Sequence, residues 1–172
     1  MSINQNRLIR RFIALTEIDS PSFREREMAD YLKRELKRLA VVVHEDDCAD
    51  RIGGNAGNIY GYLPAKDTQA RENAAPLLFL AHMDTVEPAC SRKAVVHEDG
   101  RITSDGTTVL GADDQAALAV LLEVIQELQE ENADHPPLEF LFAAAEEAYT
   151  VGASAMDLSV FQAKEAFALD LS

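Results

Sequence analysis

Hydrophobic positions repeat at helical spacing in three stretches of the chain, which predicts three amphipathic helices. The first covers residues 4–16 and ends before Pro21. The second follows Ser22 and Glu25, which match the S-x-x-E capping pattern, in which two side chains satisfy free backbone amides at a helix start. The third covers residues 112–131. The apolar faces comprise Leu8, Phe12 and Leu15 in the first helix, Met28, Tyr31, Leu32, Leu36 and Leu39 in the second, and Leu118, Leu121, Leu122, Ile125 and Leu128 in the third.

Short apolar runs between these helices predict the strands of a sheet. The runs span residues 40–44, 59–63, 77–81, 138–145 and 166–169. A hairpin is predicted over residues 95–103, because Asp99-Gly100 is a typical turn pair, and a polar surface loop is expected at 66–74. Strands that alternate with long helices predict a single α/β domain in which helices cover a mostly parallel or mixed central sheet.

Composition narrows the possible function classes. With 172 residues, 47% of them hydrophobic, the chain is large enough to bury a sizeable core. Acidic residues outnumber basic ones by 30 to 16, and a net charge of −14 argues against binding to nucleic acid or to an anionic membrane. Cys48 and Cys90 are too few for a disulfide framework. The apolar stretch after Arg11 is interrupted by Glu17 and Asp19 before a signal peptide or membrane span is complete, so we expect a cytoplasmic protein.

Four groups of acidic residues or histidine follow predicted buried strands or precede a helix, at the sheet edge where α/β folds bind ligands. His82 and Asp84 follow the run 77–81 and share one face of an extended chain, so the carboxylate could fix the tautomer of a metal-binding imidazole. Asp170 closes the run 166–169. Taken alone, a solvated polar strand end explains His82 and Asp84 about as well as a metal site does, and the single Asp170 carries little information.

The other two groups are adjacent acidic pairs. Asp113 and Asp114 lie at the start of the third helix, where one aspartate is expected as a cap and the second exceeds what a cap needs. Glu146 and Glu147 end the strand 138–145. Because neighbours on an extended chain point to opposite sides, one glutamate could bind a metal while the other serves as a general base. The alternative for the second pair is an exposed acidic corner.

The four groups recur at intervals of roughly 30 residues, the length of one β-α unit, so they could meet at a single sheet edge. One imidazole with several carboxylates is a donor set that suits zinc, cobalt or manganese. In the same order, the groups resemble the motif series of the dinuclear zinc peptidases typified by peptidase T, glutamate carboxypeptidase and succinyl-diaminopimelate desuccinylase. The motifs are His82 to Val86, Gly111 to Asp114, Glu146-Glu147 and Phe167 to Asp170, and the resemblance extends from about residue 13 to the chain end.

The resemblance implies a zinc-exopeptidase-like α/β fold with two metal ions at its centre. Asp113 would bridge the two ions, and His82 and Asp170 would complete one of the two sites. Glu147 would belong to the other site. Zinc is the implied metal, and Co²⁺ or Mn²⁺ could replace it.

The resemblance also implies hydrolysis of an amide bond in a small peptide or an N-acyl amino acid. Glu146 would act as the general base toward a water activated by the two metals, and Asp84 would orient His82. Two departures from the family pattern concern the substrate side of the site. They are Gln115-Ala116 after the aspartates and Ala148-Tyr149 after the glutamates.

Members of this family continue past the strand that ends at Asp170 into a lid domain and a returning segment with one more histidine ligand. Residues 1–172 therefore correspond to the N-terminal part of the catalytic domain, and we expect hydrolysis by this chain alone to be impaired. The alternative is a non-catalytic binding or assembly domain that keeps the fold. Glu146 argues against that alternative, because a pure binding domain has no need of a general base. The sequence leaves the oligomeric state open.

Overall fold

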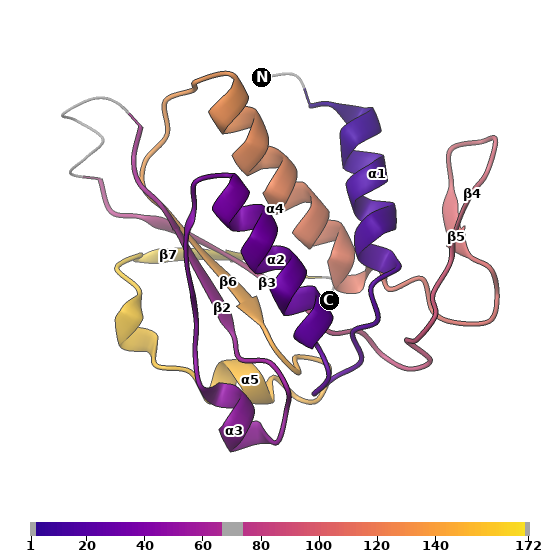
Figure 1. Ribbon diagram of the computed structural model, residues 1–172. Coiled ribbons are helices and arrows are strands. Elements are labelled where there is room, and N and C mark those ends of the chain that lie inside the picture. Colours follow the sequence, from indigo (N-terminus) through magenta and orange to yellow (C-terminus); the bar gives the residue numbers. More distant parts are fainter. Residues whose placement is uncertain (1–2, 67–73, 171–172) are drawn as a thin grey trace.

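The computed structural model describes residues 3–66 and 74–170, so most of the predicted loop at 66–74 lies outside the described residues. Three long helices, shorter helical segments and two sheets follow one another along the chain (Figure 1). The elements are α1 (Gln5–Thr16), α2 (Arg26–Arg38), β1 (Val42–Glu45), α3 (Cys48–Ile52), β2 (Ile59–Leu63), β3 (Leu77–His82), β4 (Ala94–Val96), β5 (Ile102–Ser104), α4 (Ala112–Glu130), β6 (Leu138–Ala143), α5 (Val151–Ser154), the 3₁₀ helix η1 (Leu158–Val160) and β7 (Glu165–Ala168). The predicted helices and strands are confirmed, with shifts of a few residues at their ends.

The main sheet is mixed, with the strand order β1-β2-β6-β3-β7. β1 and β2 pair antiparallel, as do β2 and β6, whereas β3 pairs parallel with both β6 and β7. In this register His82 lies opposite Ala143 of β6, and Leu80 lies opposite Ala168 of β7. The carboxyl ends of three parallel strands therefore meet at one edge of the sheet, which confirms the predicted mixed α/β fold.

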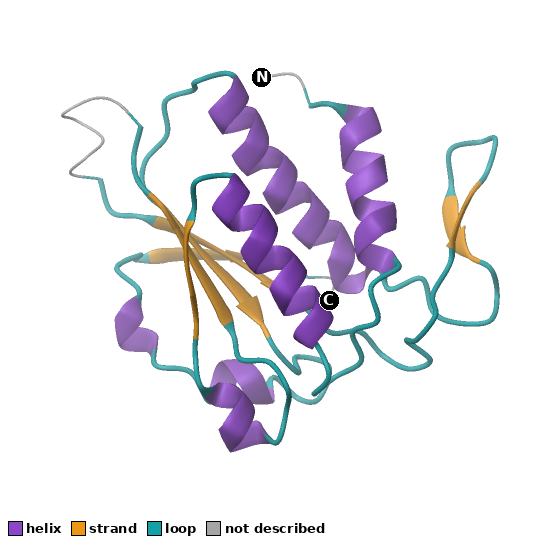
Figure 2. Ribbon diagram, in the orientation of Figure 1, coloured by secondary structure: helices purple, strands orange, loops and turns teal. Residues whose placement is uncertain are grey.

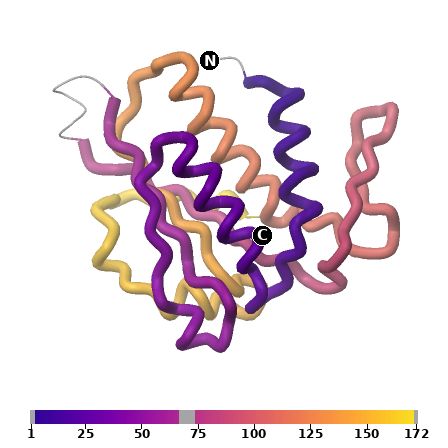
Figure 3. The backbone as a smooth tube through the Cα atoms, in the orientation of Figure 1, coloured from indigo at the N-terminus to yellow at the C-terminus, as the bar shows by residue number. Residues whose placement is uncertain are grey.

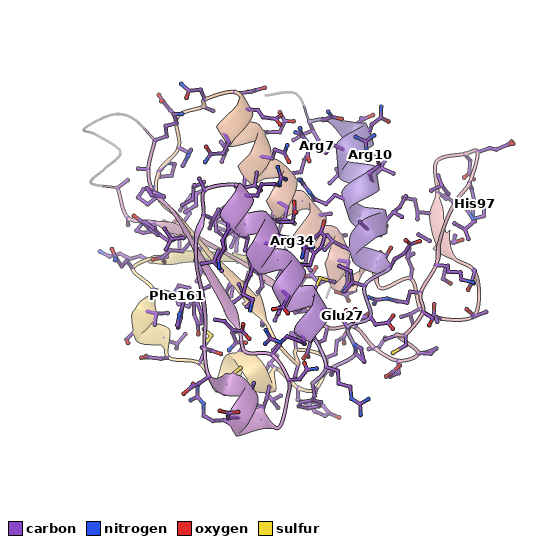
Figure 4. All side chains as sticks on the ribbon, in the orientation of Figure 1. Arg7, Arg10, Glu27, Arg34, His97 and Phe161 are labelled. Atoms are coloured by element: carbon purple, nitrogen blue, oxygen red, sulfur yellow. The ribbon has the colours of Figure 1, made fainter. Side chains whose placement is uncertain are left out.

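Helices α1, α2 and α4 cover one face of the main sheet (Figure 2). The core on that face is formed by fully buried side chains that include Leu15 of α1, Leu32 of α2, Leu118 of α4 and Phe140 of β6. Burying such side chains contributes roughly 1.5–3 kcal/mol each, so this layer supplies much of the folding free energy. A smaller apolar cluster lies on the opposite face, where Phe161 after η1 packs against the sheet (Figure 4).

Charged side chains join α1 to α4. The guanidinium of Arg7, labelled in Figure 4, contacts Glu123, Glu127 and Glu130 of α4. Arg11 forms a second ion pair with Glu123 at 2.7 Å, and the side chain of that glutamate is only 1% exposed. A buried carboxylate is tolerated here because two guanidinium groups donate to it, which fixes the position of α1 on α4.

Two local expectations from the sequence are wrong. The S-x-x-E pattern does not cap α2, because the N-cap residue Glu25 makes no side-chain capping hydrogen bond and Ser22 bonds to Asp84 instead. The first strand begins at Val42, because Ala40 adopts a left-handed backbone with φ +55° at the end of α2.

The predicted hairpin around Asp99-Gly100 is confirmed as the β4–β5 pair, which forms a separate two-stranded sheet. It projects from the rest of the molecule (Figure 3). Within residues 3–66 and 74–170, none of the helices combines the length and the apolar character needed to cross a lipid bilayer.

Glu45 at the end of β1 provides a test of the fold's electrostatics. Partial burial alone would raise its pKa, but hydrogen bonds from Arg26, Lys33 and the amide of Gly57 lower the pKa from 4.5 to about 2. Because the carboxylate is more acidic in the folded state, its contribution to stability is complete above about pH 4.5 and disappears as the pH falls toward 2.

We therefore expect Glu45→Gln to lower the free energy of unfolding by about 1–2 kcal/mol at pH 7, after allowance for solvent screening. The difference from wild type should shrink as the pH falls, and urea unfolding at a series of pH values measures it. Glu98→Gln, on the exposed hairpin, serves as the control. A Glu45→Gln effect that does not depend on pH would contradict this account.

Candidate metal centre

His82, the last residue of β3, presents one ring nitrogen to the sheet edge. The side chain is 2% exposed, and its Nδ1 donates a hydrogen bond to the backbone oxygen of Asp84 at 2.9 Å. The Asp84 carboxylate lies 3.4 Å from the same nitrogen. Because a carbonyl oxygen only accepts, Nδ1 carries a proton, and Nε2 is the ring nitrogen that can bind a cation once it has no proton of its own.

The start of α4 brings two aspartates to His82. The helix N-cap is Gly111, which has φ +74°, and no side chain caps the helix, so neither aspartate is the cap that its position suggested. Asp114 instead accepts a hydrogen bond from the backbone amide of His82 at 3.0 Å. The Oδ1 atom of Asp113 lies 3.3 Å from His82 Nε2. One aspartate therefore fastens α4 to β3, and the other faces the open side of the imidazole.

Both glutamates of the second acidic pair turn toward the same point. β6 ends at Ala143, and Ala145 has a left-handed backbone with φ +47°. β6 has ended before Glu146 and Glu147, and each of them has a carboxylate oxygen within 4.8 Å of a ring nitrogen of His82, so the expectation that they point to opposite sides is wrong. Their backbone amides donate to the Asp84 carboxylate at 2.9 and 3.1 Å, which holds this loop beside His82.

Asp170 reaches the centre from the third parallel strand. It follows β7, and its Oδ1 lies 4.0 Å from His82 Nε2, the same distance that separates Glu146 Oε2 from this nitrogen. Two sets of donor atoms result, each lying within 4.8 Å of one another. The sets are His82, Asp113 and Glu147, and His82, Glu146 and Asp170. The structure thus brings all six predicted residues to one edge, while the role of each residue stays a prediction.

The carboxylates of the centre outnumber the positive groups near them. Burial raises the pKa values of Asp113, Glu146 and Glu147, and the neighbouring acidic groups raise them further. Burial alone would lower the pKa of His82, but Asp84 and the other nearby carboxylates raise it to about 9. Negative charges packed this closely are stable only with protons or cations among them, so the donor set fits divalent metal ions.

Sequence reasoning assigned three residues of this region to other roles. One aspartate of the pair Asp113-Asp114 was expected as a helix cap, but Asp114 bonds to the backbone of His82, and burial raises its pKa to about 7. Ser22 and Glu25 were expected to cap α2, yet both bond to the loops that carry the centre. The S-x-x-E pattern marks both residues in the sequence, but only their contacts with distant loops show which part of the molecule they support. His97 lies apart, on the β4–β5 hairpin (Figure 4).

The chain is similar in structure and in sequence to known proteins. The aminopeptidase PepT of Bacillus cereus superposes with a TM-score of 0.93 at 40% identity, covering 99% of this chain and 44% of that protein. A tripeptidase of Staphylococcus aureus gives a TM-score of 0.93 at 35% identity, with coverage of 99% and 44%. Protein YqjE of Bacillus subtilis, which is uncharacterised, is 42% identical over 168 residues, 98% of this chain and 44% of its own length.

The architecture is therefore that of the peptidase T-type metallopeptidases, as the four motifs predicted. A family model for peptidase family M28 matches residues 58–169, and the chain belongs to this family. The chain spans less than half the length of the three relatives.

Charge repulsion at the centre gives a second prediction. Removing one carboxylate should relieve the repulsion, so metal-free Asp113→Asn should be as stable as wild type or more stable by up to about 1 kcal/mol. The gap should widen as the pH rises, because the raised pKa of Asp113 means that its charged form is less favourable in the folded state.

Thermal unfolding in the presence of a chelator at several pH values measures this difference. Asp50→Asn, on the exposed face of α3, is the control and should change stability by no more than about 0.5 kcal/mol. A clear loss of stability in metal-free Asp113→Asn would contradict the account that the carboxylates of the centre repel one another.

Proposed function

We propose that this chain forms part of a metal-dependent hydrolase that cleaves amide bonds in small peptides or N-acyl amino acids. The observation that carries the proposal is the meeting of four carboxylates around the imidazole of one buried histidine, at the edge where three parallel strands end and α4 begins. The relatives described as an aminopeptidase and a tripeptidase support a peptide substrate.

We assign the metal ligands as the family resemblance implies. Asp113 would lie between two ions, with His82 and Asp170 on one of them and Glu147 on the other. Two bound divalent ions, zinc or else cobalt or manganese, would lower the pKa of a shared water and polarise the scissile carbonyl. The donor atoms lie close enough together to serve this purpose, and the imidazole and carboxylates are of the types that these metals prefer.

Glu146 is proposed as the group that moves the proton. Its side chain is half-buried at the centre, and its backbone amide is held by Asp84, so the carboxylate stays at the edge where the substrate amide would bind. It would accept a proton from the attacking water and pass it to the leaving amine. Asp84 would keep the imidazole of His82 in the tautomer that leaves Nε2 free.

Zinc titration by calorimetry tests the metal centre. The wild-type chain should bind zinc, and Asp113→Ala should lose most of the heat because the ligand proposed to lie between the two ions is gone. Asp105→Ala, on the exposed segment after β5, is a control that should titrate like wild type. Identical heats for wild type and Asp113→Ala would rule out the proposed centre.

Hydrolysis of a tripeptide tests the reaction. With zinc or cobalt present, wild type should release amino acids, at a low rate if the chain acts alone, and Glu146→Gln should be slower by about 100-fold or more while still binding metal. Metal binding without any turnover would instead favour the alternative, a non-catalytic binding or assembly domain. Equal rates for wild type and Glu146→Gln would exclude Glu146 as the base.

A further inference from the structure

The turn between α1 and α2 packs against the loop that follows β3. Pro21 forms a parallel bridge with Thr85, and the carbonyl oxygen of Ser20 accepts a hydrogen bond from the Thr85 amide at 3.1 Å. Residues 20–25, here called the support turn, therefore lie beside the segment 82–85. This places side chains of the turn next to the carboxylate that faces His82.

Ser22 of the support turn completes the surroundings of Asp84. The Asp84 carboxylate is fully buried, lies 3.4 Å from His82 Nδ1, and accepts the backbone amides of Glu146 and Glu147. The hydroxyl of Ser22 donates to its Oδ2 at 2.6 Å. A carboxylate held by three donors and an imidazole has a fixed rotation, so Ser22 helps to set where Asp84 holds the ring and the glutamate loop.

Glu25 supports the same loop at its first residue. Its side chain is fully buried, and its Oε1 accepts the amides of Phe23 at 2.7 Å and Ala145 at 2.9 Å. Ala145 has φ +47°, a left-handed conformation that is unfavourable for alanine and persists only when its surroundings hold it. The hydrogen bond from the Ala145 amide to Glu25 therefore holds the backbone turn that directs Glu146 toward the metal centre.

A role confined to α2 does not explain these contacts. Neither Ser22 nor Glu25 makes a side-chain capping hydrogen bond to that helix. The second carboxylate oxygen of Glu25 has no partner among the described residues. Burying an unpaired oxygen costs free energy, and a role in α2 alone gives no reason for that cost. Both side chains are instead directed at loops that carry candidate ligands.

Building on the proposed function, we infer that Ser22 and Glu25 are positioning residues of the metal centre. Ser22 acts through Asp84 on His82, and Glu25 acts through the Ala145 backbone on the pair Glu146-Glu147. Neither residue touches a metal ion or substrate in this scheme. Their loss should therefore weaken metal binding and alter its geometry without removing a ligand.

Cobalt titration of the 172-residue chain tests the role of Ser22. Ser22→Ala should raise the Kd for Co²⁺ on the order of 10- to 100-fold, the usual result of removing a group that orients a ligand. The visible absorption band of bound Co²⁺, which reports coordination geometry, should shift in position or intensity. Ser22→Thr keeps the hydroxyl and should bind within about threefold of wild type, whereas Ser159→Ala, at an exposed serine of η1, should match wild type.

The role of Glu25 is tested with two variants, Glu25→Ala and Glu25→Gln. Glutamine retains an oxygen that can accept both amides, so Glu25→Gln should bind Co²⁺ more tightly than Glu25→Ala by about tenfold. Thermal unfolding without metal is measured for each variant, so that loss of folding is separated from loss of affinity. The Ser22 series carries the test if Glu25→Ala does not fold.

Three results would overturn the inference. The first is a Ser22→Ala variant that unfolds like wild type and has a Kd for Co²⁺ within about twofold of the wild-type value. This result would exclude the positioning role and leave the proposed metal centre unaffected. Failure of Ser22→Thr to restore affinity and spectrum would show that the hydroxyl is not what matters. Absence of Co²⁺ binding by the wild-type chain would overturn the proposed centre, and the positioning role with it.

Discussion

Parallel pairing of β3 with β6 and β7 in a single register is the constraint on which the site depends. It places the end of β3 level with the end of β6 and with Asp170, two residues after β7. Each strand thus delivers its first polar residues to the same edge, where the chain has left the apolar sheet and is free to turn. A slip of one residue in either pairing would move His82 or Asp170 to the other face of the sheet.

Asp84 turns that shared edge into a defined arrangement of side chains. As a buried carboxylate it needs several donors, and it finds them in the backbone of the glutamate loop and in Ser22. Satisfying this one group therefore fixes the histidine ring and the loop after β6 together. The cost is a concentration of negative charge at the neighbouring half-buried carboxylates, which a folded protein accepts when the charges serve a site.

Much of this arrangement could be predicted from the sequence, because it follows from periodicity. The i, i+2 spacing of His82 and Asp84 indicates a shared face, and the intervals between the acidic groups match successive β-α units. Apolar runs and helical faces likewise predict the mixed α/β fold, since burial of one face dominates the formation of each element. These are local patterns, and the structure follows them.

The features that sequence reasoning missed depend on contacts between distant segments. Ser22 and Glu25 have the spacing of a capping box, but their partners lie 62 and 120 residues away. The left-handed backbone at Ala145 is uncommon for alanine and is favoured by tertiary contacts that no local pattern contains. The proposed division of ligands between two ions likewise comes from the family resemblance, whereas the donor atoms themselves form two sets that share His82.

The most direct test of the account is the position of zinc in a crystal of this chain, located by anomalous diffraction at the zinc absorption edge. The account predicts a peak at about 2.0–2.2 Å from His82 Nε2, bonded also to carboxylate oxygens from the start of α4 and from the loop after β6 or from Asp170. Zinc bound only elsewhere on the molecule, with the imidazole of His82 free of metal, would contradict it.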